Sequence, residues 1–398
     1  MPHEFHRTDI PIRTLASGAQ LSIPVFRYEG LPGPRVYIQG NIHGPEIAGI
    51  GAIYELMQLL SEEEQIFGTI TLVPSVNPVG LDTKINAQQV GYSDLNETEV
   101  GNFNRIYQLL TTDEAQTDDD PLALHKVELS AFVHQHREAP FDEIERAFSA
   151  ALGDVIQQIW EKRGITGMSY GLKLALTIQE LSYDANILLD LHTAADAVRH
   201  LYTFEECLPD GLYLDLRNII LLEKRFGGVL DEAFLLPWFK LHQAFALAGV
   251  QLPWAQFQRE AHTLELGSAD VVDRASMRAD AERIVNYLRS KGVLRGTAQV
   301  QGPFRACEAR HYDRYNASTG GLLLWHKPPG DEVKAGETLV TILRTYQLGT
   351  HDETEVPIHA WRDGFMVGRT DTHVVHEGMS LCNIMARLRS IEAPRPSE

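Results

Sequence analysis

Three short segments of this chain carry residue types that could hydrolyse an amide with the help of a metal ion. They are His43-Gly44-Pro45-Glu46, Leu189-Asp190-Leu191-His192-Thr193 and Thr263-Leu264-Glu265-Leu266-Gly267. Two imidazoles and one carboxylate can hold a catalytic zinc ion and leave a fourth coordination position for water. A further glutamate, distant in the sequence, can then act as a base toward that water. Together the three segments predict a hydrolytic metal site.

Each segment follows or ends an apolar run that predicts a buried strand. The runs span residues 35–39, 186–190 and 261–265. In an open α/β sheet, groups at the carboxyl ends of parallel strands converge on one crevice. Residues that are distant in the sequence are therefore expected in a single site.

Taken separately, the candidate residues have ordinary structural interpretations. The spacing of His43 and Glu46 is also typical of a polar pair at a helix start, and an isolated His192 is usually a hydrogen-bonded structural residue. Chemistry is favoured by the combination, because each ligand-type residue ends a candidate core strand. Asp190 lies two residues before His192 and so points to the same strand face. It could support His192 or serve a general structural role.

Glu265 lies between Leu264 and Leu266 inside an apolar run. A charged residue in such a place is costly unless it is paired or functional. A buried salt bridge is the structural interpretation. The functional one is a carboxylate beside water that a metal has acidified, which takes the proton and later gives it to the departing amine.

Composition narrows the class of partner. The 398 residues suggest two domains, and contents of 44% hydrophobic and 22% charged residues are typical of a soluble globular protein. The formal charge is −19, from 35 Lys and Arg against 54 Asp and Glu. Nucleic acid and an anionic membrane surface both need a basic face, so neither is expected as the main partner.

Cysteine usage and hydropathy predict a cytoplasmic protein. Cys207, Cys307 and Cys382 are far apart and form no CxxC pair, which favours a reducing compartment. Residues 1–15 contain no apolar segment of a secretory signal. No apolar run approaches the roughly 20 residues of a membrane-spanning helix.

Strand and helix signals alternate through the first three quarters of the chain. Apolar residues recur at helical spacing from Ile47 to Leu60. Further expected elements are a strand at 69–73 and helices at 141–160, 171–181 and 276–288. Residues 75–98 are expected to form an irregular active-site loop, and residues 111–120 a solvated surface loop, with a lid as the alternative. This pattern predicts a three-layer α/β/α domain over residues 1–295, with a mainly parallel mixed sheet.

From about Gly296 the chain changes to short strand-like runs between Gly and Pro turns. Two loosely similar sets, at 321–342 and 364–384, predict a small all-β domain over residues 296–398 with internal pseudo-symmetry. The pattern is similar to the lipoyl/biotinyl barrel sandwich. Residues 346–361, between the halves, contain no carrier Lys, so a structural or interfacial role is expected instead of a swinging arm. A homo-oligomer is compatible with this prediction.

Five motifs occur in an order that resembles one known family. They are His43-Gly-Pro-Glu46, Asn77-Pro78-Val-Gly80, Asn102-Phe-Asn104-Arg105, Asp190-Leu-His192-Thr193 and Thr263-Leu-Glu265-Leu-Gly267. In this order they are similar to the succinylglutamate desuccinylase/aspartoacylase family, within the zinc carboxypeptidase-like superfamily. The motifs cover roughly residues 36–270, and the β-rich tail is similar to the C-terminal domain of that family.

The resemblance implies a zinc-carboxypeptidase-like α/β/α hydrolase that cleaves a small N-acyl amino acid or related amide, with one zinc ion per chain. It implies His43, Glu46 and His192 as the zinc ligands and Glu265 as the general base and acid. It also implies that Asn104 and Arg105 clamp a substrate carboxylate, for which a planar guanidinium beside an amide is suited.

The chain departs from the family pattern at one place. Relatives commonly carry another Arg, upstream of the Asn-Arg pair, that polarises the scissile carbonyl, whereas residues 77–103 contain no Arg. Either zinc stabilises the oxyanion largely alone, or Lys84, Tyr92 or Arg199 substitutes. Loss of one oxyanion donor typically costs about 10²–10³ in rate.

Two other functions remain compatible with the motifs. One is a zinc carboxypeptidase that acts on short peptides, which the superfamily motifs allow. The other is a non-catalytic binding protein that keeps the pocket, for which the missing Arg is the only support.

Overall fold

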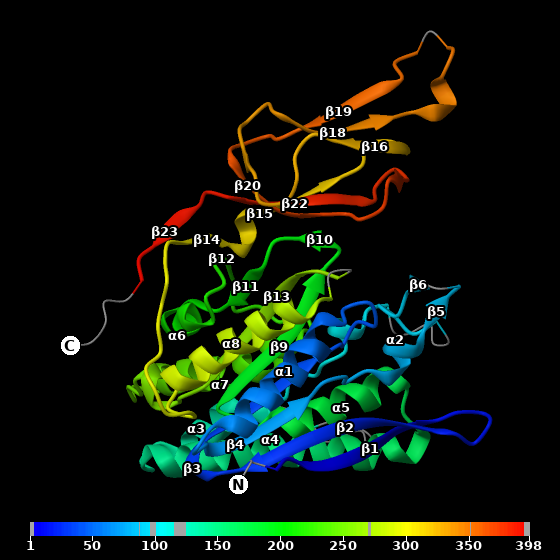
Figure 1. The fold of residues 1–398 in the computed structure, drawn as a ribbon. Helices are drawn as coiled ribbons and strands as arrows, with labels where there is room; N and C mark the ends of the chain where they lie inside the picture. Colours follow the sequence, from blue (N-terminus) through cyan, green and yellow to red (C-terminus); the bar gives the residue numbers. More distant parts are fainter. Residues whose placement is uncertain are drawn as a thin grey trace.

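The computed structural model describes residues 4–86, 88–95, 101–114, 125–269, 272–350 and 352–393. A ten-stranded sheet runs through the larger part of this structure (Figure 1). In spatial order its strands are β1 (His6–Thr14), β2 (Gln20–Glu29), β4 (Phe67–Val73), β3 (Leu31–Gly40), β9 (Ile187–Ala194), β13 (Glu260–Ser268), β11 (His200–Thr203), β12 (Asn218–Leu221), β14 (Phe304–Glu308) and β23 (Arg389–Ile391).

The central strands of this sheet share one direction. β4, β3, β9 and β13 run parallel to one another. Antiparallel pairs occur outside them, between β2 and β4, between β13 and β11, and at both edges. The predicted mixed α/β sheet is thereby confirmed, and the carboxyl ends of β3, β9 and β13 meet at one end of it.

Helices cover both faces of the large sheet. α1 (Ala48–Glu62) and α8 (Arg274–Ser290) share one hydrophobic core with one face of the central strands. α5 (Tyr170–Ser182) and α7 (Leu230–Leu247) share another core with the opposite face. α3 (Leu129–His136) and α4 (Phe141–Thr166) pack against α5 and α7 in a further cluster.

Alternate residues of strand β9 pack into the hydrophobic cores on the two faces of the large sheet. Leu188 belongs to the core with α5 and α7, whereas Leu189 and Leu191 belong to the core with α1 and α8. This alternation follows the period of two of a strand. Asp190 and His192 therefore lie on the same face as Leu188, with α5 and α7.

Two smaller sheets form the C-terminal part of the chain. One contains β10 (Asp196–Ala197), β20 (Gly364–Arg369), β22 (Ser380–Ala386) and β15 (Tyr312–Asn316), with β17 (Glu332–Val333) also paired to β20. The other contains β19 (Glu355–His359), β18 (Thr338–Leu343), β16 (Gly321–Trp325) and β21 (Val374–Val375). A hydrophobic cluster with members on β16, β18, β20 and β22 fills the space between them.

The C-terminal part is joined to the large sheet in more than one place. β10, which follows the end of β9, pairs with β20 of the C-terminal sheet, and Arg369 bridges Asp196 at 2.7 Å. Conversely, β14 and β23 belong to the large sheet. The change of sheet thus comes after β14 and not at the expected boundary of residue 296.

The remaining elements lie in the connections. α2 (Pro78–Asp82) and the hairpin of β5 (Lys84–Ile85) and β6 (Gln88–Gln89) fall in the expected irregular loop 75–98. β7 (Thr111–Thr112) pairs with β8 (Val127–Glu128), and α6 (Leu208–Gly211) follows β11. The residues 115–120 of the expected surface loop lie outside the described residues.

Candidate functional site

The turn after β3 presents His43 and Glu46. Asn41 begins it in the left-handed region, with φ of 63°. The Asn41 amide donates to the carbonyls of His43 at 2.9 Å and Gly44 at 3.1 Å. A Cβ at Gly44 would lie 1.9 Å from the carbonyl oxygen of Gly80, so only glycine fits at this place. The tight turn holds both polar side chains toward the end of the sheet.

Asn77 fixes this turn from outside. Its amide nitrogen donates to the carbonyl of Ile42 at 2.7 Å. Its side-chain oxygen accepts hydrogen bonds from Gly80 N at 2.9 Å and from the Tyr170 hydroxyl at 2.8 Å. The residue that the sequence places in an ordinary turn therefore also caps α2 and anchors the loop of His43.

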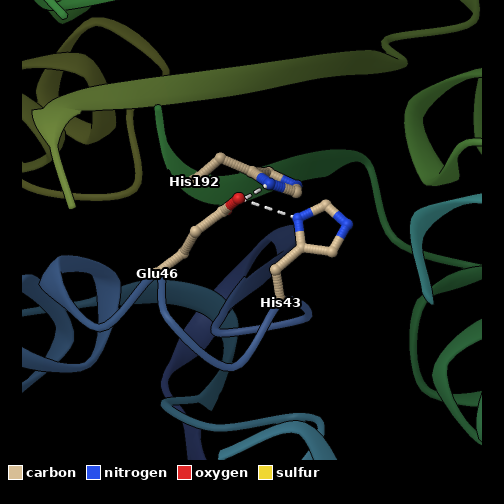
Figure 2. A group of neighbouring side chains, drawn as sticks. All are labelled: His43, Glu46 and His192. Atoms are coloured by element: carbon tan, nitrogen blue, oxygen red, sulfur yellow. Dashed lines mark hydrogen bonds and ion pairs between the residues drawn. The ribbon is translucent and has the colours of Figure 1, made fainter. Parts of the chain in front are cut away.

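His43, Glu46 and His192 come together as a buried group (Figure 2). Their ligand atoms lie within 4.8 Å of one another. The Glu46 carboxylate contacts Nδ1 of His43 at 2.8 Å with one oxygen and Nδ1 of His192 at 2.8 Å with the other. The structure thus assembles the three predicted ligands at the ends of β3 and β9.

The outer nitrogens of both imidazoles contact hydrogen-bond acceptors. His43 Nε2 is 3.0 Å from Asn102 Oδ1, and His192 Nε2 is 3.0 Å from Asp190 Oδ2. These oxygens favour a proton on Nε2, which leaves the lone pair of each Nδ1 for a metal ion. This is the arrangement by which histidine ligands are usually oriented, and it fits the proposed set of donors.

A buried polar chain supports Asp190 from beneath. Gln39 Nε2 donates to the other oxygen of Asp190 at 2.9 Å, and the Tyr37 hydroxyl donates to Gln39 Oε1 at 2.9 Å. All three side chains are almost fully buried. The orientation of His192 therefore depends on buried residues of β9 and of the neighbouring strand β3.

The charge state of Glu46 suits a ligand. Burial alone would raise the pKa of Glu46, but His192 and His43 lower it to about 2. The Thr193 backbone N–H adds a contact to the same carboxylate at 3.3 Å. Glu46 is thus an anion at neutral pH.

Glu265 faces His192 across neighbouring strands, because the two residues are paired in the register of β13 and β9. Burial raises the pKa of Glu265 to about 8, His192 partly opposes this, and Glu46 and Asp190 add to it. Its Oε2 has no hydrogen-bond partner among the described residues. Three carboxyl groups around two imidazoles in a buried place form a donor set that a cation would stabilise.

An aromatic wall flanks Glu265 on the side away from His192. His200 of β11 is its partner in the register, and the rings of Tyr202 and Tyr312 lie 6.1 Å apart edge-to-face. Burial raises the pKa of both tyrosines, and the charge of Glu265 adds to this. Tyr312 belongs to β15, so the C-terminal part contributes to the surroundings of Glu265.

Asn104 and Arg105 lie in the 3₁₀ turn η1 (Phe103–Arg105). Asn104 is buried, with Nδ2 3.4 Å from His192 Nε2, and its Oδ1 has no hydrogen-bond partner among the described residues. Arg105 is exposed and donates to the carbonyl of Asn104. Asn104 therefore borders the group of ligands directly, whereas Arg105 lies at its rim.

The three candidates for the missing Arg lie in different places. The Tyr92 ring centroid is 5.0 Å from that of His43, and Lys84 is an exposed residue of β5. Arg199 is held by Asp280 of α8 through two hydrogen bonds at 2.8 and 3.0 Å. The hypothesis that Arg199 substitutes is not supported, because its guanidinium is already engaged by α8, on the sheet face opposite to His192.

Sequence reasoning missed several supporting residues. Asn102 stands out only as part of a motif, and Gln39 and Tyr37 only as strand residues without a role. Their signal is a polar side chain inside an apolar strand run, which is costly unless it is hydrogen-bonded. The same argument that singles out Glu265 could have found Gln39.

Known proteins resemble this chain in sequence and in fold. The model of the succinylglutamate desuccinylase/aspartoacylase catalytic domain matches residues 32–290. The chain belongs to the succinylglutamate desuccinylase/aspartoacylase family. It is similar to a crystal structure of a family protein from Shewanella amazonensis SB2B, with 31% identity, a TM-score of 0.87, and coverage of 97% of this chain and 100% of that one.

Two further solved structures are similar to this chain. One is from Shewanella frigidimarina NCIMB 400, with 28% identity, a TM-score of 0.87, and coverage of 98% of this chain and 99% of that one. The other is the ectoine utilization protein EutE (DoeB) of Ruegeria pomeroyi, with 15% identity, a TM-score of 0.64, and coverage of 96% and 99%. The latter likeness concerns the fold alone. None of the curated proteins matches this chain.

No helix among the described residues is both long enough and apolar enough to span a membrane.

Proposed function

We propose that this family member is a zinc-dependent hydrolase that cleaves the amide bond of a small N-acyl amino acid or related amide. His43, Glu46 and His192 would hold one zinc ion per chain. The main support is the orientation of the two imidazoles, whose Nδ1 atoms face Glu46 while Asn102 and Asp190 accept hydrogen bonds from their outer nitrogens. Such orientation is expected of metal ligands.

When bound, the zinc ion would supply Lewis acidity that polarises the amide carbonyl and acidifies water. Glu265 takes the proton of the attacking water and gives it to the leaving nitrogen as the carbon–nitrogen bond breaks. Its buried position beside His192 suits both roles, because a carboxyl group with a raised pKa can both accept and return a proton near neutral pH.

The other residues position the substrate in this proposal. The unpartnered Asn104 Oδ1 offers an acceptor beside His192, and Arg105 at the rim would bind a substrate carboxylate in bidentate fashion. Tyr92, next to His43, would take the place of the missing Arg at the carbonyl oxygen, with Lys84 as the alternative. The three cysteines are buried and unpaired, which supports a reducing, cytoplasmic location.

The experiment is hydrolysis of N-acetyl and N-succinyl amino acids by zinc-loaded and chelator-treated protein. Zinc-dependent release of a free amine is expected, and Glu265→Gln should keep stoichiometric zinc but lose turnover. His43→Ala should lose the zinc. Near-wild-type turnover of Glu265→Gln would contradict the assignment of the base, and stoichiometric zinc in folded His43→Ala would contradict the ligand set.

The same assay with dipeptides and tripeptides as substrates distinguishes a deacylase from the alternative of a short-peptide carboxypeptidase. Faster cleavage of these peptides than of N-acyl amino acids would overturn the deacylase proposal. Absence of any zinc-dependent amide hydrolysis would favour the binding-protein alternative.

A further inference from the structure

A large groove lies beside the candidate zinc site, and of its lining residues only Tyr92 and Lys84 have a role in the chemistry described above. Its volume is about 1450 Å³. Its lining comes mainly from the turn before α1 and the first half of that helix, the β5–β6 hairpin with Tyr92, the start of α8, and residues 371–372 after β20. Leu81, Ala195 and Ala269 complete it. We call this the long groove.

The long groove borders the candidate zinc site, although His43, Glu46 and His192 are not among its lining residues. Pro45 and Ile47, which line it, are the neighbours of Glu46 in the chain. Tyr92 also lines it, and its ring is 5.0 Å from the ring of His43. Ala195, three residues after His192, forms part of the same wall. Through Tyr92 the groove borders the ligand group, so a molecule with an amide at the zinc site would extend into it.

The long groove is much larger than a small N-acyl amino acid requires. Since a water molecule occupies about 30 Å³, the groove has room for ~50 waters. Pockets for whole drug-sized ligands usually have volumes of about 300–1,000 Å³. An acetyl or succinyl group would leave most of this groove filled with water.

Apolar surface makes up somewhat more of the lining of the long groove than polar surface, to which Gln88, Gln89 and Thr372 contribute. Ile47, Ile50, Val272 and Met277 face it, and Tyr54, also in the wall, is 51% exposed. A Cβ at Gly51 would meet the end of the Met277 side chain at 2.5 Å, which shows how closely α1 and α8 approach at its floor. Methionine is flexible and polarizable, so it adapts to apolar occupants of different shape.

Charges in the long groove largely balance one another. Glu55 is paired with Arg274 at 3.2 Å and lies 3.8 Å from Arg278. The remaining charged lining residues are Lys84 and Asp371, one of each sign, and both are exposed. The groove thus offers no excess charge to attract a strongly charged occupant.

We propose that the long groove binds an extended apolar acyl chain, so that the substrates are N-acyl amino acids with medium or long aliphatic acyl groups. This inference rests on the proposed deacylase function. Asn104 and Arg105 are not among the residues of the groove. The amino-acid carboxylate and the acyl chain would therefore be held by different walls of the site.

The first test is the zinc-loaded enzyme with N-acylglycines and N-acyl-L-glutamates from acetyl to decanoyl. The ratio kcat/KM should rise about two- to fourfold for each added methylene, because full burial of a methylene stabilises by about 0.8 kcal/mol. A preference for acetyl or succinyl over decanoyl would overturn the inference while leaving the deacylase proposal intact. Faster cleavage of apolar peptides than of acyl amino acids would overturn both the inference and the deacylase proposal.

A matched pair of variants on α8 locates the effect. Met277→Trp fills the groove, whereas Ala275→Trp adds the same side chain at an exposed position of the same helical turn that does not line it. Met277→Trp should lower the decanoyl-to-acetyl ratio of kcat/KM at least tenfold, and Ala275→Trp should leave this ratio unchanged. Equal ratios in both variants would refute binding in the groove.

A binding measurement separates the inference from catalysis. Calorimetric titration of zinc-loaded Glu265→Gln with N-decanoylglycine should show at least tenfold tighter binding than with N-acetylglycine, and Met277→Trp in the same background should remove the difference. This result with no turnover in the wild-type protein would refute the hydrolase proposal but support the groove. Equal affinity for both acyl groups would refute the groove.

Discussion

The replacement Asp190→Asn tests whether the support beneath His192 controls the metal site. Asp190 accepts from His192 Nε2 at 3.0 Å and from Gln39 Nε2 at 2.9 Å. An asparagine of the same shape has only one acceptor oxygen, and the Gln39 amide would claim it. The new amide nitrogen would then face His192 and donate to its Nε2. The proton of His192 would move to Nδ1, where it competes with a metal ion.

The expected loss is about 10–100-fold in zinc affinity, the usual effect of removing such a support, which corresponds to about 1.4–2.8 kcal/mol. A charge-assisted hydrogen bond contributes a similar amount, about 1.5–3 kcal/mol. Zinc affinity is measured by competition with a chromogenic chelator at pH 7.5, and circular dichroism checks the fold. Asp280→Asn is the control. Asp280 of α8 is buried like Asp190, but it pairs with Arg199 and Arg283 instead of a histidine. The zinc affinity of Asp280→Asn should equal that of the wild type.

A double variant sharpens this prediction. Gln39→Met removes the competing donor, so the asparagine introduced by Asp190→Asn can turn its oxygen toward His192 and restore the Nδ1 lone pair. Asp190→Asn should therefore cost less zinc affinity in the Gln39→Met background than in the wild type. Folded Asp190→Asn protein with wild-type affinity, or equal losses in both backgrounds, would refute the tautomer argument.

Three further predictions follow from the geometry of the site. In the metal-free protein, Glu265 has a pKa of about 8 against 4.5 ordinarily, so the folded state retains a proton that the unfolded state releases, and stability should fall as pH rises from about 5 to 8. Urea unfolding of metal-free Glu265→Gln should lack this component, and parallel pH profiles for the variant and the wild type would contradict it. Gly44→Ala places a Cβ 1.9 Å from the Gly80 carbonyl oxygen and should lower the free energy of unfolding by about 1–3 kcal/mol. The control Gly164→Ala, whose Cβ would have no atom within 4 Å, should not lower it. Equal melting temperatures of the two variants would show that the turn relaxes freely. Tyr92→Phe should lower kcat by about 10²-fold at unchanged zinc content if its hydroxyl serves the carbonyl oxygen, and Lys84→Met should change kcat less than tenfold; the reverse order would assign this role to Lys84.

The strands and helices that carry the site could be predicted because their patterns are strong. β9 is an apolar run interrupted by Asp190 and His192, and in β13 Glu265 stands between two leucines. A polar residue inside a buried strand needs a reason, and ligation or catalysis supplies one. The parallel arrangement then places these residues at one end of the sheet, as expected.

Other elements have no sequence pattern that would predict them as clearly. α7 is buried on most sides, so its sequence has no polar face that would reveal a helical period, and Pro237 lies inside it. The β1–β2 hairpin has exposed residues along much of its length. The contribution of Asn102 depends on the path of a loop, which local sequence does not determine. The same holds for the engagement of Arg199 by Asp280, since two residues 81 positions apart meet only in the folded chain.

The place of β23 in the large sheet sets the order in which this protein can be completed during synthesis. β23 pairs with β14 as the edge strand, yet it comes from residues 389–391 of a chain of 398. Because a chain is made from its N-terminus, the large sheet acquires this strand only after the residues of both smaller sheets have been synthesised. Until then the β14 edge, with its free backbone groups, is open to pairing with other chains. A chain truncated before β23 would therefore contain all residues of the candidate site and an unprotected, aggregation-prone sheet edge.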